Sequence, residues 1–132
     1  MKKVLIIDKY NIGSIIAKEL INRYLNGIKA YSVGLEEIKE INSNLKEALL
    51  QEEIKIEDNN IIKWNGLEDI DFNLIVLISD IEKEIKDKFG KRNRIISVFF
   101  DDLREEDELD KYIEVAKEIK EKLLPIVRKK LS

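Results

Sequence analysis

The chain has 132 residues, of which 44% are apolar and 39% are charged, and its formal net charge is −3. We expect one globular domain over residues 1–132, because this length and composition suffice for a buried core. Charges of both signs are interspersed, so neither nucleic acid nor an anionic membrane is an expected partner. The sequence contains neither Cys nor His. Disulfides, thiolate metal sites and two of the commonest catalytic side chains are thereby excluded.

The sequence also lacks the patterns that direct a chain into or across a membrane. No apolar run reaches the roughly 18–20 residues that span a bilayer. The N-terminus shows no signal-peptide pattern. We therefore expect a cytoplasmic protein.

Four short segments rich in Val, Ile and aromatic residues are predicted to be β-strands: Lys3–Ile7, Ile28–Val33, Asn73–Ile78 and Arg94–Phe100. The first, third and fourth are nearly continuous apolar runs, which is typical of parallel strands that are covered on both faces. Helical patterns lie between the strands. This alternation predicts a four-stranded parallel sheet with right-handed crossover connections.

The helical patterns differ in length. Apolar residues recur at helical spacing over Ile12–Leu25, and Asn26-Gly27 is a typical C-terminal stop. The segment Glu52–Asn65 is expected to be irregular, with one short apolar stretch around Ile61. Three shorter helices are predicted: one that Ser43 or Asn44 caps and that ends at Leu50, one over Gly66–Asp69, and one that Asp80 caps, that reaches Phe89 and that Gly90 ends.

The last helix is the longest. Apolar residues recur mostly at three- and four-residue steps over Leu109–Leu131. Pro125 should bend or interrupt its final turns, because proline has no backbone N–H to donate. The acidic run 105–108 and the basic run 128–130 are expected to be solvated helix ends that suit the helix dipole.

The junction between the first strand and the first helix, Val4 to Ser14, is the most informative stretch for function. A buried strand runs directly into a short polar turn and then into an amphipathic helix. Proteins with α/β folds usually place their ligand site at this point, outside the carboxyl ends of the strands.

Three further segments resemble the low-molecular-weight protein tyrosine phosphatase and arsenate reductase family. Tyr31-Ser32-Val33-Gly34 is similar to the family's Ser-Ala-Gly segment after the second strand. The run from Asp71 to Ser79 resembles its third strand, and Val98 to Asp102 resembles its Asp-Pro loop. The likeness covers nearly the whole chain. It implies a three-layer α/β/α fold with the family's Rossmann-like topology.

The catalytic loop of that family, Cys-x5-Arg-Ser, is both matched and altered here. Asn11-Ile12 coincide with an Asn-Ile pair that is frequent in the middle of the loop. Asp8 stands where the nucleophilic Cys is expected, Ser14 where the Arg is expected, and Ile15 where the Ser is expected. Thiolate chemistry is therefore impossible, and a carboxylate at position 8 would repel a phosphate dianion. The bidentate clamp of the Arg is missing as well.

Parts of the family's scaffold remain. Asn11 and Ser32 match polar positions that hold the loop in shape by hydrogen bonding, and Ser14 could supply the support of the missing serine. Asp101 matches the family's general acid, although Asp102 replaces the usual Pro. The resemblance therefore implies a catalytically inactive relative, without a cofactor, that binds a small anion or a partner protein at the former active-site edge. The residues that would form this binding loop are Asp8, Lys9, Tyr10, Asn11, Ile12, Gly13 and Ser14.

Individual residues of this edge allow two interpretations. Lys9 could attract an anion to the helix start, or it could be an ordinary exposed lysine. Tyr10 and Trp64 could frame an aromatic pocket. Trp64 could equally be a partly buried plug between the irregular segment and the sheet.

The alternative function is a divergent, metal-assisted phosphatase that uses Asp8 and Asp101. Asp8, Asp80, Asp101 and Asp102 all follow predicted strands, so they could converge at one edge of the sheet and hold Mg²⁺. The structural interpretation of the same residues assigns Asp80 to a helix N-cap and places Asp101 and Asp102 in a solvated loop. A third possibility is a structural subunit that acts only through assembly.

Overall fold

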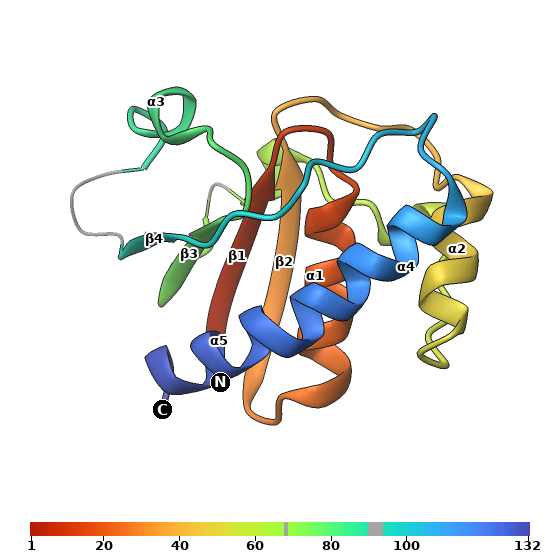
Figure 1. The fold of residues 1–132 in the computed structure, drawn as a ribbon. Coiled ribbons are helices and arrows are strands. Elements are labelled where there is room, and N and C mark those ends of the chain that lie inside the picture. The colour runs from red at the N-terminus through yellow and green to blue at the C-terminus, as the bar shows by residue number, and fades with distance from the viewer. Residues whose placement is uncertain (68, 90–93) are drawn as a thin grey trace.

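The computed structural model of the protein describes residues 1–67, 69–89 and 94–132. Its centre is a parallel sheet in the order β2-β1-β3-β4 (Figure 1). The strands are β1 (Lys2–Asp8), β2 (Ile28–Gly34), β3 (Leu74–Leu77) and β4 (Ile95–Ser97). The predicted four-stranded parallel sheet is confirmed, although β3 and β4 are shorter than the apolar runs from which they were predicted.

The inner strand β1 is buried on both faces, which explains its unbroken apolar sequence. Val4 and Ile6 point into one core cluster, whereas Leu5 and Ile7 point into a second cluster on the opposite face of the sheet. All four side chains are fully buried. Alternation with a period of two residues therefore builds two cores from one continuous run.

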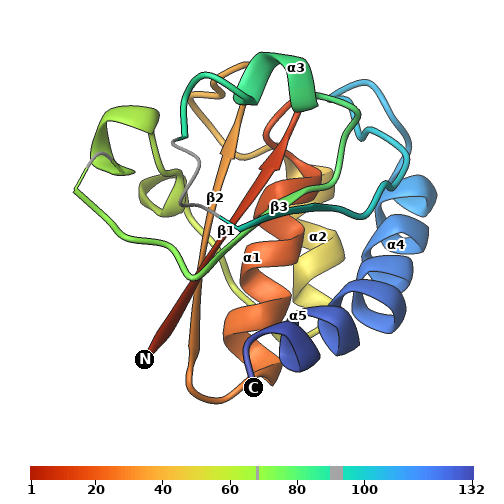
Figure 2. The ribbon, with the colours of Figure 1, turned by 90° about the vertical axis from the view of Figure 1, so that its left-hand side faces the viewer.

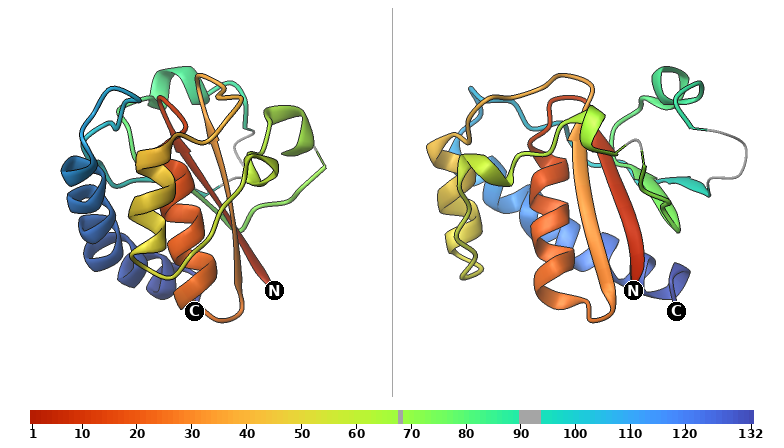
Figure 3. Two further views of the ribbon diagram at one scale, coloured as in Figure 1. Left: turned by 90° about the vertical axis from the view of Figure 1, so that its right-hand side faces the viewer. Right: turned by 180° about the vertical axis from the view of Figure 1, so that it is seen from behind.

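The two faces of the sheet are covered by elements of different size (Figures 2 and 3). One face carries the helices α1 (Gly13–Tyr24), α2 (Ser43–Leu50), α4 (Leu109–Glu118) and α5 (Leu124–Lys130). The other face carries the short 3₁₀ helix η2 (Trp64–Leu67) and the single-turn helix α3 (Glu82–Ile85). The α/β class is confirmed, with the second helical layer reduced to short elements.

The structure corrects two of the predicted helix caps. Asn42 caps α2, because its side-chain oxygen accepts a 2.8 Å hydrogen bond from the N–H of Leu45. Neither Ser43 nor Asn44 takes this role, because both lie within the helix. Asp80 is exposed, and the cap position of α3 belongs to Ile81, which packs into the core instead. Gly90, the predicted end of this helix, lies outside the described residues.

The C-terminal helix is interrupted just before Pro125, as predicted. Between α4 and α5 the chain makes a π-helical turn, η3 (Ile119–Leu123). Pro125 is then the second residue of α5, a first-turn position that does not need a backbone N–H inside the helix. Pro125 has no N–H to donate to the carbonyl one turn upstream. The widened turn therefore lies before the proline.

The segment between α2 and β3 is irregular, as predicted, with a 3₁₀ turn η1 at Asp58–Asn60. The helix expected at Gly66–Asp69 is replaced by η2, which ends at Leu67; residue 68 lies outside the described residues. Across the parts of the chain that the structure describes, no helix is long and apolar enough to cross a bilayer.

Candidate functional site

The candidate site lies at the carboxyl edge of the sheet, where β1 ends at Asp8 and the chain turns into α1. The end of β2 runs beside this turn, because the N–H groups of Leu35 and Glu36 donate to the carbonyls of Asp8 and Lys9 at 3.0 Å each. The end of β3 flanks it on the other side through a bond from the N–H of Ile78 to the carbonyl of Ile7. The loop is therefore held between two neighbouring strands.

The carboxylate of Asp8 fills the hollow of this loop. Its Oδ1 accepts hydrogen bonds from the N–H of Asn11 at 2.8 Å and from Oγ of Ser14 at 2.7 Å. Its Oδ2 accepts from the N–H groups of Ile12 and Ser14, at 3.1 Å each. Asp8 is only 4% exposed. The amides of the loop thus point at a common centre, and that centre is occupied by a side chain of the protein itself.

Two backbone features hold the loop in this shape. Asn11 has a φ of +58°, the left-handed conformation that Asn tolerates better than most residues. Gly34 lies against it so closely that an added Cβ would be 2.5 Å from the backbone nitrogen of Asn11. Glycine at position 34 is therefore a steric requirement of the loop.

Side-chain support of the loop comes from Ser14. Its Oγ lies 3.1 Å from Oδ1 of Asn11 in addition to its contact with Asp8. Ser32, expected to share this support, is buried, and its Oγ makes no hydrogen bond within the described residues. Ser14 thus serves the loop from the helix side, whereas Ser32 contributes no hydrogen bond from β2.

Burial controls the ionisation of Asp8. Removal of the carboxyl from water raises its pKa from 3.8 to about 6, because the low dielectric of the interior disfavours the charged form. The hydrogen bonds from Ser14, Ile12 and Asn11 act in the opposite direction and offset part of this rise. Asp8 is therefore an acid whose protonation lies closer to neutral pH than that of an ordinary aspartate.

The other acidic candidates do not join Asp8. Asp102 accepts a short hydrogen bond from Oγ of Ser79, which in turn accepts from the N–H of Lys9 at 3.1 Å. Asp80 and Asp101 are exposed. Within residues 1–67, 69–89 and 94–132, no three acidic side chains gather into a set that could hold a metal ion. The convergence of the four aspartates that the alternative Mg²⁺ site would use is not seen among the described residues, since Asp8 turns into its own loop and Asp102 is directed toward Ser79.

The aromatic residues Tyr10 and Trp64 do not share a pocket either. Tyr10 lines a hollow of about 500 Å³ next to the loop, and the guanidinium of Arg104 lies 4.8 Å from its ring centroid. Lys9 is exposed, with its Nζ 5.4 Å from the same centroid. Trp64 lines a separate cavity and packs, half-buried, against the second core cluster. The interpretation of Trp64 as a plug is the one that agrees with this packing.

The role of Asp8 as the occupant of the loop escaped the sequence interpretation, which treated the carboxylate as repelling a ligand. A signal for it exists in the sequence. Asp is a strong acceptor of N–H bonds at helix starts, and here it stands a few residues before α1. An aspartate repels a phosphate, but it can itself accept the N–H hydrogen bonds that a phosphate would accept.

Three solved structures show what this fold is similar to. A YwlE mutant from Bacillus subtilis is 18% identical, with 99% of both chains covered and a TM-score of 0.75. A low-molecular-weight protein tyrosine phosphatase from Bacillus subtilis is 19% identical over 98% of this chain and 96% of its own, with a TM-score of 0.72. An arsenate reductase from Archaeoglobus fulgidus is 21% identical over 94% and 98%, with a TM-score of 0.67.

These similarities extend over nearly the full length of each chain. No protein-family model matches the sequence, and no curated protein matches it either. At these identities the comparison establishes the architecture. The chain has the fold of the low-molecular-weight protein tyrosine phosphatases and arsenate reductases, as its sequence predicted.

Proposed function

We propose that this protein is a non-catalytic binding domain whose carboxylate at position 8 permanently occupies the anion cradle of the fold, and which acts by binding a partner protein at that edge. The observation that carries the proposal is the set of four hydrogen bonds that Asp8 accepts from Asn11, Ile12 and Ser14. A cradle filled in this way offers a small oxyanion neither free donors nor space.

The absence of Cys from the sequence supports loss of the phosphatase reaction. Asp8 itself is badly placed to replace a thiolate as nucleophile. Both of its oxygens accept hydrogen bonds, and its side chain is buried. To attack phosphorus, the carboxylate would have to give up these bonds and vacate the space that the phosphoryl group needs. Chemistry through Asp8 is therefore disfavoured by the same contacts that order the loop.

The surface beside the loop favours a partner protein over a small anion. The hollow next to Tyr10 is lined by more acidic than basic side chains, namely Glu36, Glu37, Glu40, Glu105 and Glu106 against Lys39 and Arg104. Such a lining repels phosphate-like dianions. A macromolecular surface can contact the rim of this hollow without entering the cradle.

An anion-binding experiment tests the occupied cradle. Thermal unfolding of the wild type and of Asp8→Gly would be followed at increasing concentrations of inorganic phosphate. We expect the wild type to show only the general stabilisation that phosphate gives folded proteins, and Asp8→Gly an additional rise of about 3–5 °C once phosphate exceeds its Kd tenfold. Asp101→Asn, which removes an exposed acid nearby, is the charge-matched control and should behave like the wild type. An equal rise in the wild type and in Asp8→Gly would contradict the proposal, and Asp8→Ser provides a second variant if Asp8→Gly does not fold.

Two further assays address catalysis and partner binding. Turnover of an aryl phosphate by the wild type, with or without Mg²⁺ or Mn²⁺, that is lost in Asp8→Asn would establish the metal-assisted phosphatase instead. Partner binding is tested by affinity capture from a lysate of the source organism, comparing the wild type with Arg104→Glu and Lys117→Glu. A protein retained by the wild type and by Lys117→Glu, but lost by Arg104→Glu, is the expected result. Equal capture by all three would place the interaction elsewhere on the molecule.

A further inference from the structure

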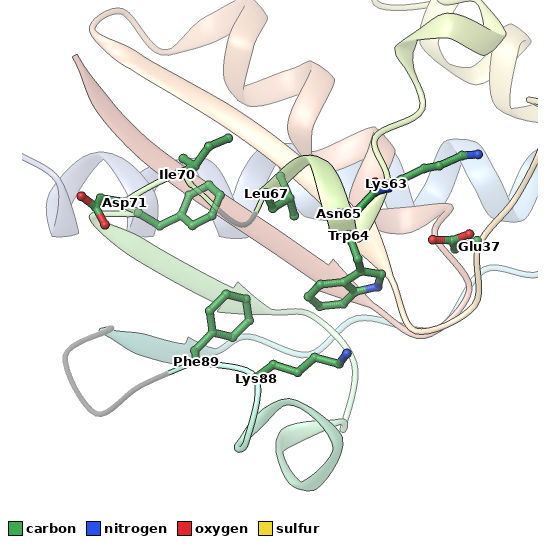
Figure 4. A pocket seen from close by; sticks show the side chains of 10 residues that line it. Glu37, Lys63, Trp64, Asn65, Leu67, Ile70, Asp71, Lys88 and Phe89 are labelled. Carbon is green, nitrogen blue, oxygen red and sulfur yellow. The ribbon is translucent and has the colours of Figure 1, made fainter.

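A second cavity, of about 810 Å³, lies on the sheet face opposite the long helices (Figure 4). It opens between η2 and the chain that follows α3. Its apolar lining consists of three aromatic and two aliphatic side chains: Trp64, Phe72, Phe89, Leu67 and Ile70. A concave site of this size with aromatic walls has the dimensions of a small-molecule pocket.

Trp64 is held firmly at one end of this cavity. Its indole Nε1 donates a 2.7 Å hydrogen bond to the carbonyl of Gly34, which fixes the position of that edge of the ring. Its centroid lies 6.2 Å from that of Phe89, with the two planes inclined by 41°. The polar atom of the indole is thereby satisfied within the protein, and the ring is left to make apolar and stacking contacts.

The charged residues of the lining are not distributed evenly. Nζ of Lys88 lies 4.7 Å from the centroid of Trp64, in a cation–π arrangement. Lys63 and Glu37 lie near the same end, whereas Asp71 stands at the opposite end (Figure 4). The charge that directly contacts the aromatic wall is therefore positive.

We propose that this cavity binds a flat aromatic compound that carries an acidic substituent. The rings of Trp64 and Phe89 would contact the aromatic body, and the ammonium of Lys88 would pair with the acidic group. A cationic ligand would have to place its charge beside Lys88 in order to reach Glu37, or extend to Asp71 at the far end. The inference goes beyond the proposed function, because none of these residues belongs to the loop 8–14.

The test uses the only tryptophan of the chain as a reporter. Energy transfer from Trp64 to 8-anilinonaphthalene-1-sulfonate, an aromatic sulfonate, would be titrated in the folded protein, with far-UV circular dichroism recorded to verify the fold. N-phenyl-1-naphthylamine is the matched neutral probe, because it has the same rings without the sulfonate. We expect saturable binding of one sulfonate per chain, about fivefold tighter than the neutral probe, which is the upper range for a partly exposed ion pair.

Variants separate this site from nonspecific association. Lys88→Gln should remove most of the difference between the two probes, whereas Lys117→Gln, an exposed lysine on the other side of the sheet, should leave it unchanged. Phe89→Leu keeps an apolar residue and should weaken both probes severalfold. Absence of saturable energy transfer would overturn the inference, as would equal affinities for both probes or an unchanged preference in Lys88→Gln. Asp8→Asn should bind the sulfonate like the wild type, so that failure here and failure of the proposed function are distinguishable.

Discussion

Titration of Asp8 should make the stability of this protein depend on pH in an unusual direction. Its pKa is about 6 in the folded state, because the carboxyl is buried, against 3.8 for an exposed aspartate. A group with a raised folded pKa binds its proton more tightly when the chain is folded. The folded state is therefore favoured at low pH, and this contribution is lost as the pH rises from about 4 to above 6.

The size of the effect follows from the two pKa values. Linkage between pKa values of 3.8 and about 6 gives a loss of about 2 kcal/mol in the free energy of unfolding between pH 4 and pH 7. Other acids oppose this trend. The pKa of Asp107, for example, is held below its ordinary value by the hydrogen bond from the backbone N–H of Arg104. The wild type alone therefore does not isolate Asp8.

A comparison with Asp8→Asn isolates it, since the variant keeps every other titrating group. Urea unfolding of both proteins at pH 4, 5, 6 and 7, monitored by circular dichroism, gives the difference in free energy of unfolding at each pH. The wild type should be favoured over the variant most at pH 4, and this advantage should shrink by about 2 kcal/mol by pH 7. A difference that is flat across this range, or that grows with pH, would refute the argument. It would mean that the four hydrogen bonds of the loop outweigh desolvation of the carboxylate.

Two further substitutions test the local geometry. Gly34→Ala should destabilise the protein by about 1–3 kcal/mol, because the new Cβ would lie 2.5 Å from the backbone nitrogen of Asn11, which cannot move aside. Gly66→Ala is the control, because no atom lies within 4 Å of its new Cβ. Its free energy of unfolding should stay within about 0.5 kcal/mol of the wild type. Asn42→Ala should cost about 1–2 kcal/mol in urea unfolding through loss of the cap on α2 and of the hydrogen bond that Asn42 donates to the hydroxyl of Tyr112, whereas Ser43→Ala should be nearly neutral. Equal effects at positions 42 and 43 would show that the cap is misassigned, and a tolerated Gly34→Ala would show that the loop can relax.

The strands could be predicted because their burial leaves a direct trace in the sequence. Val4 to Ile7 form a continuous apolar run because they contribute to both cores, and a short run rich in Val and Ile that is followed by a polar turn favours a strand. The cap of α2 was harder to predict. Asn42, Ser43 and Asn44 are all good capping residues, and only the backbone conformation selects Asn42.

The site could be located but not interpreted from the sequence. Its position at the end of β1 follows from general properties of parallel sheets. The direction of a side chain, however, depends on the loop that surrounds it. Asp8 and Asp102 both follow strands at the same edge, yet one turns into the loop amides and the other toward Ser79. The tendency of Asp to accept N–H bonds at helix starts favours the first direction for Asp8, but the pattern of residue types does not decide it, and the set of aspartates considered for Mg²⁺ could not be judged from the sequence for that reason.

The hydrogen bonds of Asp8 also bear on what free anions could do inside a cell. The carboxylate is covalently part of the chain, so its effective concentration in the cradle far exceeds the concentration of any dissolved anion. A dissolved anion would have to displace it by mass action. Millimolar phosphate would therefore leave the cradle unchanged. The protein would be insensitive to swings in phosphate or arsenate, and a change in the residue at position 8 would be needed to open the cradle to the solvent.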